Sequence, residues 1–183
     1  VQGDITVDTD VEGFKTFAEG IVPAIDILVN NAGIDIEQAN PRIEEVGIDL
    51  LEHVFSVNTL GTVRVCKALL PLIRKSTQPT RGLIANTTSG LASMSNPIMM
   101  TRYGYMMSKV SINMLSRGMA FEFGENGPTV VAWSPGWVQT RLGTPNATYT
   151  LDEGGRGNVT TLKSITANQS GKVIDMSGEE WSF

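Results

Sequence analysis

The chain alternates between short apolar runs and longer amphipathic stretches, and this alternation limits its fold more than any other feature. Apolar runs lie at 25–29, 82–86 and 129–133, and the stretches between them carry apolar residues at helical spacing. Strands that alternate with helices are joined by crossovers, so they pair in parallel and helices cover both faces of the sheet. The sequence therefore predicts an α/β fold with a doubly wound, mostly parallel sheet.

The same reading places helices along the chain at 10–20, 43–72, 103–124 and 151–165, with a break near Gly47 in the second. A candidate strand at 1–5 opens the chain, and a short strand at 172–175 closes it. No repeat or linker divides the sequence, so we expect residues 1–183 to form a single domain. Because the first residue is Val1, inside an apolar-looking stretch, we expect this domain to be incomplete at its N-terminus.

Charge and composition exclude several classes of protein. Fourteen Lys and Arg against 19 Asp and Glu give a net charge of −5, which lacks the basic surface of a nucleic-acid-binding or membrane-surface protein. One cysteine and one histidine make a disulfide impossible within the chain and a zinc site improbable. We therefore expect no nucleic-acid or membrane partner and no metal. The absence of a signal peptide and of a disulfide framework predicts a cytoplasmic protein.

Tyr105 and Lys109 stand four residues apart in a predicted helix, so their side chains share one face. A phenol with a pKa near ~10 is a poor acid–base group at neutral pH. A cation about 4 Å away, at an effective dielectric near 20, favours the phenolate by about 4 kcal/mol, or about 3 pKa units. Tyr103 cannot take this role on the same argument, because the residue four positions after it is Met107, which carries no charge. Spacing alone is nevertheless more typical of an ordinary exposed helix pair.

Further motifs appear in a fixed order along the same framework. Polar segments follow the predicted strands at 30–33 (Asn-Asn-Ala-Gly), 87–90 (ending Ser89-Gly90) and 134–140 (Pro135-Gly136 to Thr140). Asn58 lies in Val-Asn-Thr-Leu-Gly, within the second predicted helix. With Tyr-Met-Met-Ser-Lys, these segments resemble the short-chain dehydrogenase/reductase family over nearly the whole chain. The loop after Thr140 and the Gly-Glu-Glu-Trp ending are similar to its small carbonyl-reductase branch, which includes C-factor and sniffer proteins.

The resemblance implies a Rossmann-like fold and an NAD(P)-dependent oxidoreductase that reduces a carbonyl or oxidises a secondary alcohol by hydride transfer. Tyr105 would be the general acid–base, and Lys109 would lower its pKa and hold the cofactor ribose. Ser89 would hydrogen-bond the substrate oxygen. Asn58 would hold a water of a proton relay, at a kink in its helix.

The family's cofactor contacts fall on residues at the strand ends, and each has a purely structural alternative. They are Asp4, Asn30, Ala32, Gly33, Tyr105, Lys109, Pro135, Gly136 and Thr140. The Asn-Asn-Ala-Gly turn could instead fix strand packing, Pro135-Gly136 could simply end a strand, and Asp4 could be a helix N-cap. Trp137 is expected beside the nicotinamide, and Arg102 and Tyr103 are candidates for the substrate side. NADP is slightly favoured over NAD, and relatives suggest a homodimer through the long helices.

The sequence departs from the family at one motif. No Gly-x-x-x-Gly-x-Gly turn, which would cradle the pyrophosphate after the first strand, occurs in the 183 residues, and Gly154-Gly155-Arg-Gly157 falls in a predicted helix. We therefore expect a Rossmann-like sheet lacking the first βαβ unit. Residues 1–5 would then pair beside 25–29 or stay loose. Two functions remain open: an oxidoreductase of small carbonyl or alcohol substrates, and a non-catalytic remnant or interaction module.

Overall fold

The computed structural model describes residues 1–36, 42–95 and 102–182. Its α-helices are α1 (Asp8–Ile21), α2 (Ile48–Phe55), α3 (Thr62–Ile73), α4 (Tyr103–Phe123) and α5 (Leu151–Ser164). Its strands are β1 (Ile27–Asn30), β2 (Leu83–Thr87), β3 (Thr129–Ser134), β4 (Val173–Asp175) and β5 (Glu180–Trp181). Short helical turns are η1 (Ile43–Glu45), η2 (Ser56–Gly61), η3 (Gly90–Ala92) and η4 (Ala167–Gln169). Within these ranges, no helix is both long and apolar enough to span a bilayer.

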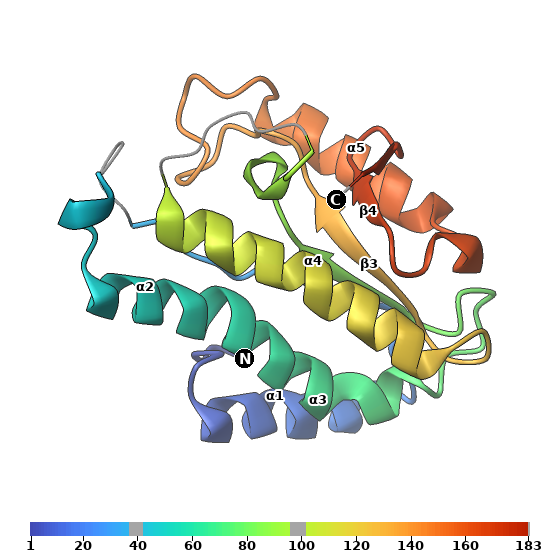
Figure 1. Cartoon of the computed structure of the whole chain (residues 1–183). Coiled ribbons are helices and arrows are strands. Elements are labelled where there is room, and N and C mark those ends of the chain that lie inside the picture. Colours follow the sequence, from blue (N-terminus) through green and yellow to red (C-terminus); the bar gives the residue numbers. More distant parts are fainter. Residues whose placement is uncertain (37–41, 96–101, 183) are drawn as a thin grey trace.

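The strands form one sheet in the order β1-β2-β3-β4-β5, and the first four are parallel (Figure 1). The predicted α/β class and the parallel sheet are confirmed. β5 pairs antiparallel with β4 and was not predicted. Two residues, Glu180 and Trp181, are too few to carry a period-two signal.

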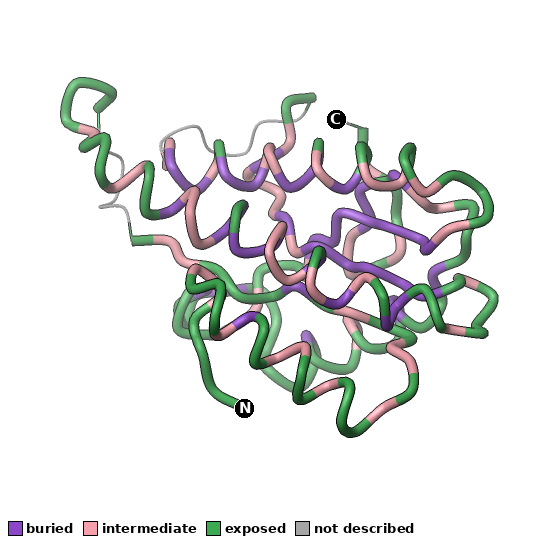
Figure 2. The backbone as a smooth tube through the Cα atoms, turned by 90° about the horizontal axis from the view of Figure 1, so that it is seen from below, coloured by how far each residue is buried: buried purple, intermediate pink, exposed green. Residues whose placement is uncertain are grey.

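Helices cover the sheet on both faces, as the doubly wound architecture requires. Alternate residues of a strand point to opposite sides, so β2 and β3 supply two cores. Ile84 and Val130 pack with Cys66, Leu69 and Ile73 of α3, next to apolar residues of α1 and α4. The opposite core lies under α5, and its members are Leu83, Ala85, Val131, Trp133, Leu162, Ile165 and Ile174. Figure 2 shows buried backbone concentrated in the strands and the inner sides of the helices.

The predicted helix at 43–72 is interrupted twice. Gly47 is extended and caps the start of α2, which confirms the expected break there. Between α2 and α3, η2 is a π-helical turn that contains Asn58, so the expected kink at Asn58 is also found. Such turns insert one residue per turn and redirect side chains, and they are frequent at functional sites.

The prediction of a strand at 1–5 is wrong. The segment makes a turn before α1, in which the Asp4 side chain accepts hydrogen bonds from the backbone N–H and the hydroxyl of Thr6. It does not pair with β1, because β2 is the only neighbour that β1 has among the described residues. It is not loose either: Ile5 lies against Gly61, where any added Cβ would clash with it. Local Asx-turn bonding here competes with strand pairing.

Candidate active site

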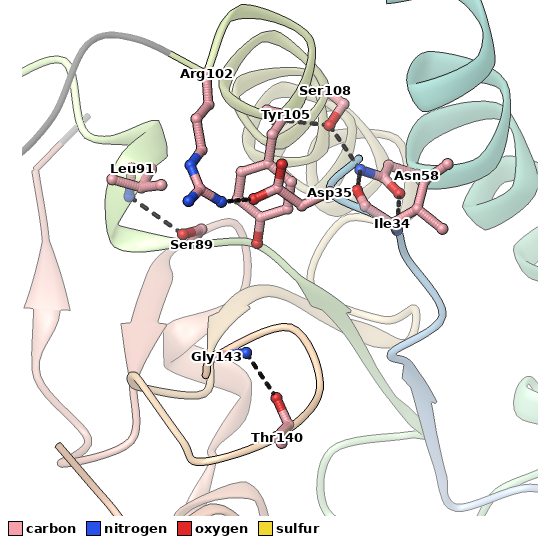
Figure 3. Close-up of polar contacts among 10 residues, drawn as sticks. All are labelled: Ile34, Asp35, Asn58, Ser89, Leu91, Arg102, Tyr105, Ser108, Thr140 and Gly143. Atoms are coloured by element: carbon pink, nitrogen blue, oxygen red, sulfur yellow. Dashed lines mark hydrogen bonds and ion pairs between the residues drawn. The ribbon is translucent and has the colours of Figure 1, made fainter. Parts of the chain in front are cut away.

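The polar segments that follow β1, β2 and β3 meet at the carboxyl edge of the sheet, and α4 begins beside them (Figure 3). Parallel pairing in register forces this arrangement, because the carboxyl ends of all parallel strands lie at one edge. Tyr105 and Ser108 come from the first turns of α4, Ser89 follows β2, and Asn58 comes from the π-turn. Residues far apart in sequence therefore converge on one edge, as the motif order predicts.

Tyr105 is buried at this edge, and the Ser89 side chain lies close enough to it to affect the pKa of its phenol. Ser89 also caps η3, because its Oγ accepts a 3.2 Å hydrogen bond from the Leu91 N–H. Burial raises the pKa of Tyr105 above its ordinary value, and the Ser89 side chain lowers it by less. The phenol therefore keeps its proton at neutral pH in this arrangement.

Lys109 is buried one turn further along α4. Its Nζ donates a 2.7 Å hydrogen bond to the Thr87 carbonyl and lies 5.6 Å from the centre of the Tyr105 ring. Removal from water lowers the pKa of Lys109 to about 8. We expected this cation to lower the pKa of Tyr105, but that pKa is raised. Both groups are buried together, so loss of solvation is the largest effect on each.

Asn58 holds the segment that follows the Asn-Asn-Ala-Gly turn. Its Oδ1 accepts a 2.7 Å bond from the Ile34 N–H, and its Nδ2 donates to the Ile34 carbonyl and to the Ser108 hydroxyl. Ser108 in turn donates to the Tyr105 carbonyl. Asn58 thus ties the loop after β1 to the helix that carries Tyr105 and Lys109. The proton-relay water expected at Asn58 stays a prediction.

The Asn-Asn-Ala-Gly turn combines packing with close approach to the site. Asn30 is buried, and its Nδ2 donates to Asn86 Oδ1 at 2.8 Å and to Cys66 Sγ at 3.1 Å. Burial raises the pKa of the Cys66 thiol to about 12, which makes it an inert packing group. A Cβ on Gly33 would lie 3.2 Å from Asn58 Oδ1 and 3.5 Å from Lys109 Nζ. The packing alternative therefore holds for Asn30, while Ala32 and Gly33 are exposed beside the site.

The segment after β3 lines the other side of the sheet edge. Gly136 has a φ of 77°, in the region that favours glycine, and a Cβ there would meet the Tyr149 ring at 3.2 Å. The Pro135 carbonyl accepts a hydrogen bond from the Asn158 side chain. Thr140 Oγ1 accepts a 3.0 Å bond from the Gly143 N–H, which closes a tight loop (Figure 3). Trp137 is exposed on this loop.

Asp4 lies outside this cluster of bonds. The residue that caps α1 is Val7, so the N-cap alternative for Asp4 is wrong. Asp4 is exposed, and hydrogen bonds from Thr6, the backbone one first, lower the pKa of its carboxyl. Its expected contact with a cofactor stays a prediction.

Sequence reasoning missed Asp35. This carboxylate follows Ile34 and forms an ion pair with Arg102, the residue immediately before α4 (Figure 3). The pair is close enough to Tyr105 to affect its pKa, which Asp35 raises and Arg102 lowers, both more weakly than burial and Ser89 do. An acidic residue two positions after the Asn-Asn-Ala-Gly turn, between two isoleucines, was the available signal.

The nicotinamide end of a dinucleotide fits this edge. An ammonium has three N–H donors, and Lys109 shows one bond, to Thr87, while sitting next to Gly33, whose missing side chain leaves room there. Gly154, Gly155 and Gly157 lie inside the helix α5, as predicted, and so they do not form a phosphate-binding loop. The residues present thus match the ribose and nicotinamide but include no glycine-rich pyrophosphate turn.

A doubly wound sheet with a buried tyrosine and lysine at its carboxyl edge defines a class of dinucleotide-dependent oxidoreductases. The comparisons make the assignment specific: the family model for short chain dehydrogenase matches residues 1–151, and the chain belongs to this family. It is 31% identical to C-signal of Myxococcus xanthus over 167 residues. The matched region covers 91% of this chain and 98% of C-signal.

Two solved structures extend the comparison. Carbonyl reductase Sniffer of D. melanogaster superposes with a TM-score of 0.93, at 24% identity over 100% of this chain and 77% of that one, which shows the fold. A short-chain dehydrogenase/reductase from Burkholderia multivorans with bound NADP gives a TM-score of 0.84 at 28% identity, over 99% and 75% of the two chains. The expected likeness to the C-factor and sniffer branch is confirmed.

Proposed function

We propose that the chain carries the acid–base and substrate half of an NAD(P)-dependent carbonyl reductase. The observation that carries the proposal is the buried Tyr105, with the Ser89 side chain close enough to lower its pKa and with Lys109 buried beside it. These groups come from two elements of the sheet edge where this fold binds its ligands. The NADP-bound relative from Burkholderia supports the choice of cofactor.

The residues have distinct tasks in this proposal. Ser89 and Tyr105 hydrogen-bond the substrate carbonyl oxygen, and as the carbon accepts hydride, the phenol proton of Tyr105 moves to that oxygen to give the alcohol. The raised pKa of Tyr105 keeps the phenol protonated at neutral pH, which suits reduction. Asn58 fixes the loop through Ile34, so it holds the site's shape.

The cofactor, NADP or NAD, supplies the hydride when bound. Lys109 would hold its ribose hydroxyls with the two ammonium hydrogens not directed at Thr87. Ala32, Gly33, Pro135, Gly136 and Thr140 would border it, and Asp4 would lie further toward the adenosine. Asn30, whose side chain is used in packing, would meet the cofactor only through its backbone. NADP is the more favoured of the two, because the Burkholderia relative holds NADP.

Fluorescence titration with NADPH and NADH tests the proposal. The 183-residue chain is compared with the same chain preceded by the first βαβ unit, with its glycine-rich turn, of a solved carbonyl reductase. We expect the extended version to bind NADPH and to reduce small ketones, and Tyr105→Phe to lower its kcat by about 10² to 10⁴-fold with cofactor binding retained. A folded extended version that neither binds nor turns over would contradict the proposal.

A second candidate is an interaction module without catalysis. It is favoured by the match to C-signal, a protein of nearly the same span whose name denotes a signal. In the titration above, failure of both versions to bind nucleotide, with both folded, would favour this candidate.

We also propose a homodimer formed through the long helices, in the cytoplasm. Met107, Met114 and Phe121 are exposed at seven-residue intervals along α4, so they form one apolar stripe. Leu60 is exposed on the neighbouring π-turn. Analytical ultracentrifugation tests the dimer, and Met114→Glu should shift it to monomer.

A further inference from the structure

We infer that Asp35 and Arg102 select substrates with a hydroxyl group on the carbon next to the carbonyl. This inference rests on the proposed function and specifies its substrate class. The two side chains form an ion pair beside Tyr105, between the loop after β1 and the start of α4 (Figure 3). Neither residue takes part in the hydride or proton transfer proposed above.

The burial of Asp35 is the first reason. Its side chain is 4% exposed, and only one of its oxygens meets Arg102. Among the residues that the structure describes, Asp35 Oδ1 is buried with no hydrogen-bond partner. Buried carboxylate oxygens are nearly always paired, so an orphaned one beside a reactive group points to a donor that arrives with a ligand.

The exposure of Arg102 is the second reason. Its side chain is 33% exposed, and the contact with Asp35 uses one of the five N–H donors of a guanidinium. The pair therefore combines exposed donors on Arg102 with a buried acceptor on Asp35 that has no partner. A hydroxyl group can donate to Asp35 Oδ1 and accept from the guanidinium at once, which neither an apolar group nor a carbonyl can do.

The position of the pair sets where that hydroxyl must be. Arg102 immediately precedes α4, and Figure 3 shows its guanidinium beside the Tyr105 ring. Asp35 follows Ile34, whose backbone is clamped by Asn58. Figure 3 shows the ion pair beside both Ser89 and Tyr105, so with the reacting oxygen at these two residues we place the pair next to the adjoining carbon of the substrate.

The charge of the pair excludes an anionic substituent. Arg102 is already neutralised by Asp35, and the unpaired oxygen of Asp35 would repel a carboxylate. A neutral hydroxyketone therefore fits this site better than a keto acid does.

The first test measures binding without catalysis. The Arg102 Nε–H resonance of the ¹⁵N-labelled 183-residue chain is followed during titration with hydroxyacetone, butanone and pyruvate. We expect a saturable shift with hydroxyacetone that butanone and pyruvate do not produce. Equal shifts with hydroxyacetone and butanone, a response to pyruvate alone, or no response at all would overturn the inference.

The second test uses the extended, cofactor-binding version. Asp35→Ala should lower kcat/KM for hydroxyacetone at least tenfold and change that for butanone less than threefold, and Arg102→Met should act in the same direction. Asp8→Ala, which breaks the exposed ion pair of Asp8 with Arg64, is the matched control and should change neither value. Equal losses on both substrates would show that the pair is only structural and would overturn the inference.

The two tests separate this inference from the proposed function. Reduction of both ketones with no preference for hydroxyacetone would support the proposed reductase function and contradict the role of Asp35 in substrate selection. Selective binding of hydroxyacetone without reduction would support the binding role of the ion pair and contradict the proposed reductase function. If Asp35→Ala fails to fold, the titration of the unmodified chain still decides.

Discussion

β3 and β1 belong to one parallel sheet, yet they differ sharply in how they are covered. All six residues of β3 are buried, with helices over both of its faces. In β1, Leu28 packs into the α3 core, but Ile27 and Val29, on the opposite face, are each 41% exposed. Figure 1 shows α5 lying over β3 and β4, away from β1.

The difference bears on function because the two strands hold different parts of the site. Ser89 follows β2, and Tyr105 and Lys109 lie on α4; Tyr105 and Lys109 are buried, and Ser89 is partly buried. β1 leads into the turn at 30–33, on the side where the family binds the rest of its dinucleotide. We infer that the catalytic part of the site rests on the well-covered half of the sheet and the nucleotide part on its thinly covered half.

The largest expected effect comes from removing the bulkiest side chain of β3. Trp133 is 2% exposed, and Trp133→Ala should lower the free energy of unfolding by about 4 kcal/mol, through lost burial and the cavity left behind. Urea denaturation measures the change. Trp137→Ala is the matched control, since Trp137 is 54% exposed, and it should cost less than about 1 kcal/mol. Similar losses in the two variants would contradict the picture of a packed β3.

A valine in each strand makes the comparison direct. Val131 of β3 is fully buried, and Val131→Ala should cost about 2 kcal/mol in unfolding free energy. Val29→Ala in β1 removes the same atoms from a half-exposed place and should cost less than about 1 kcal/mol. If Val29→Ala proved as costly as Val131→Ala, another surface must cover β1 in solution.

The pH dependence of stability reports on Lys109 in the packed half. A lysine whose pKa falls from 10.5 to about 8 on folding binds fewer protons when folded, so stability rises as pH passes from about 8 toward 10.5. Above pH 9 the buried Cys66, with its pKa raised from 9.0 to about 12, acts in the opposite direction. Between pH 8 and 9 we expect a gain of about 1 kcal/mol.

Lys109→Met is the control for this rise, because it keeps the apolar stem and removes the buried charge. Urea denaturation at several pH values should show no rise between pH 8 and 9 for this variant, and a slight fall from Cys66. A variant that keeps the full rise would show that another group causes it.

The smallest effect on stability is expected at the exposed face of β1. Val29→Lys places a charge on a half-exposed strand, which should change the unfolding free energy by less than about 1 kcal/mol while lowering self-association, because charged side chains discourage edge pairing. Light scattering at increasing protein concentration measures this. Unchanged scattering would mean that β1 is not an associating surface.

Much of this protein could be read from its sequence, because periodicity and motif order are local properties. The apolar runs predicted β1, β2, β3 and β4, and the helical spacing predicted α1, α4 and α5 within a few residues. It predicted α2 and α3 as one stretch, 43–72, which the structure divides at η2. The motifs predicted which residues meet at the carboxyl edge, since parallel pairing leaves no other arrangement. The prediction for residues 1–5 was wrong, because their apolar residues indicated a strand where the Asp4 side chain stabilises a turn.

Three features were decided only by the tertiary structure. The pKa of Tyr105 depends on how deeply α4 buries it, and a spacing of four residues cannot report burial. The bonds of Asn58 depend on the π-turn, which brings its amide to the backbone of Ile34. Arg102, the partner of Asp35, lies 67 residues further along the sequence. The two meet only because α4 packs against the loop after β1. Sequence patterns thus determined which chemical groups the edge contains, and long-range packing decided their ionisation and their partners.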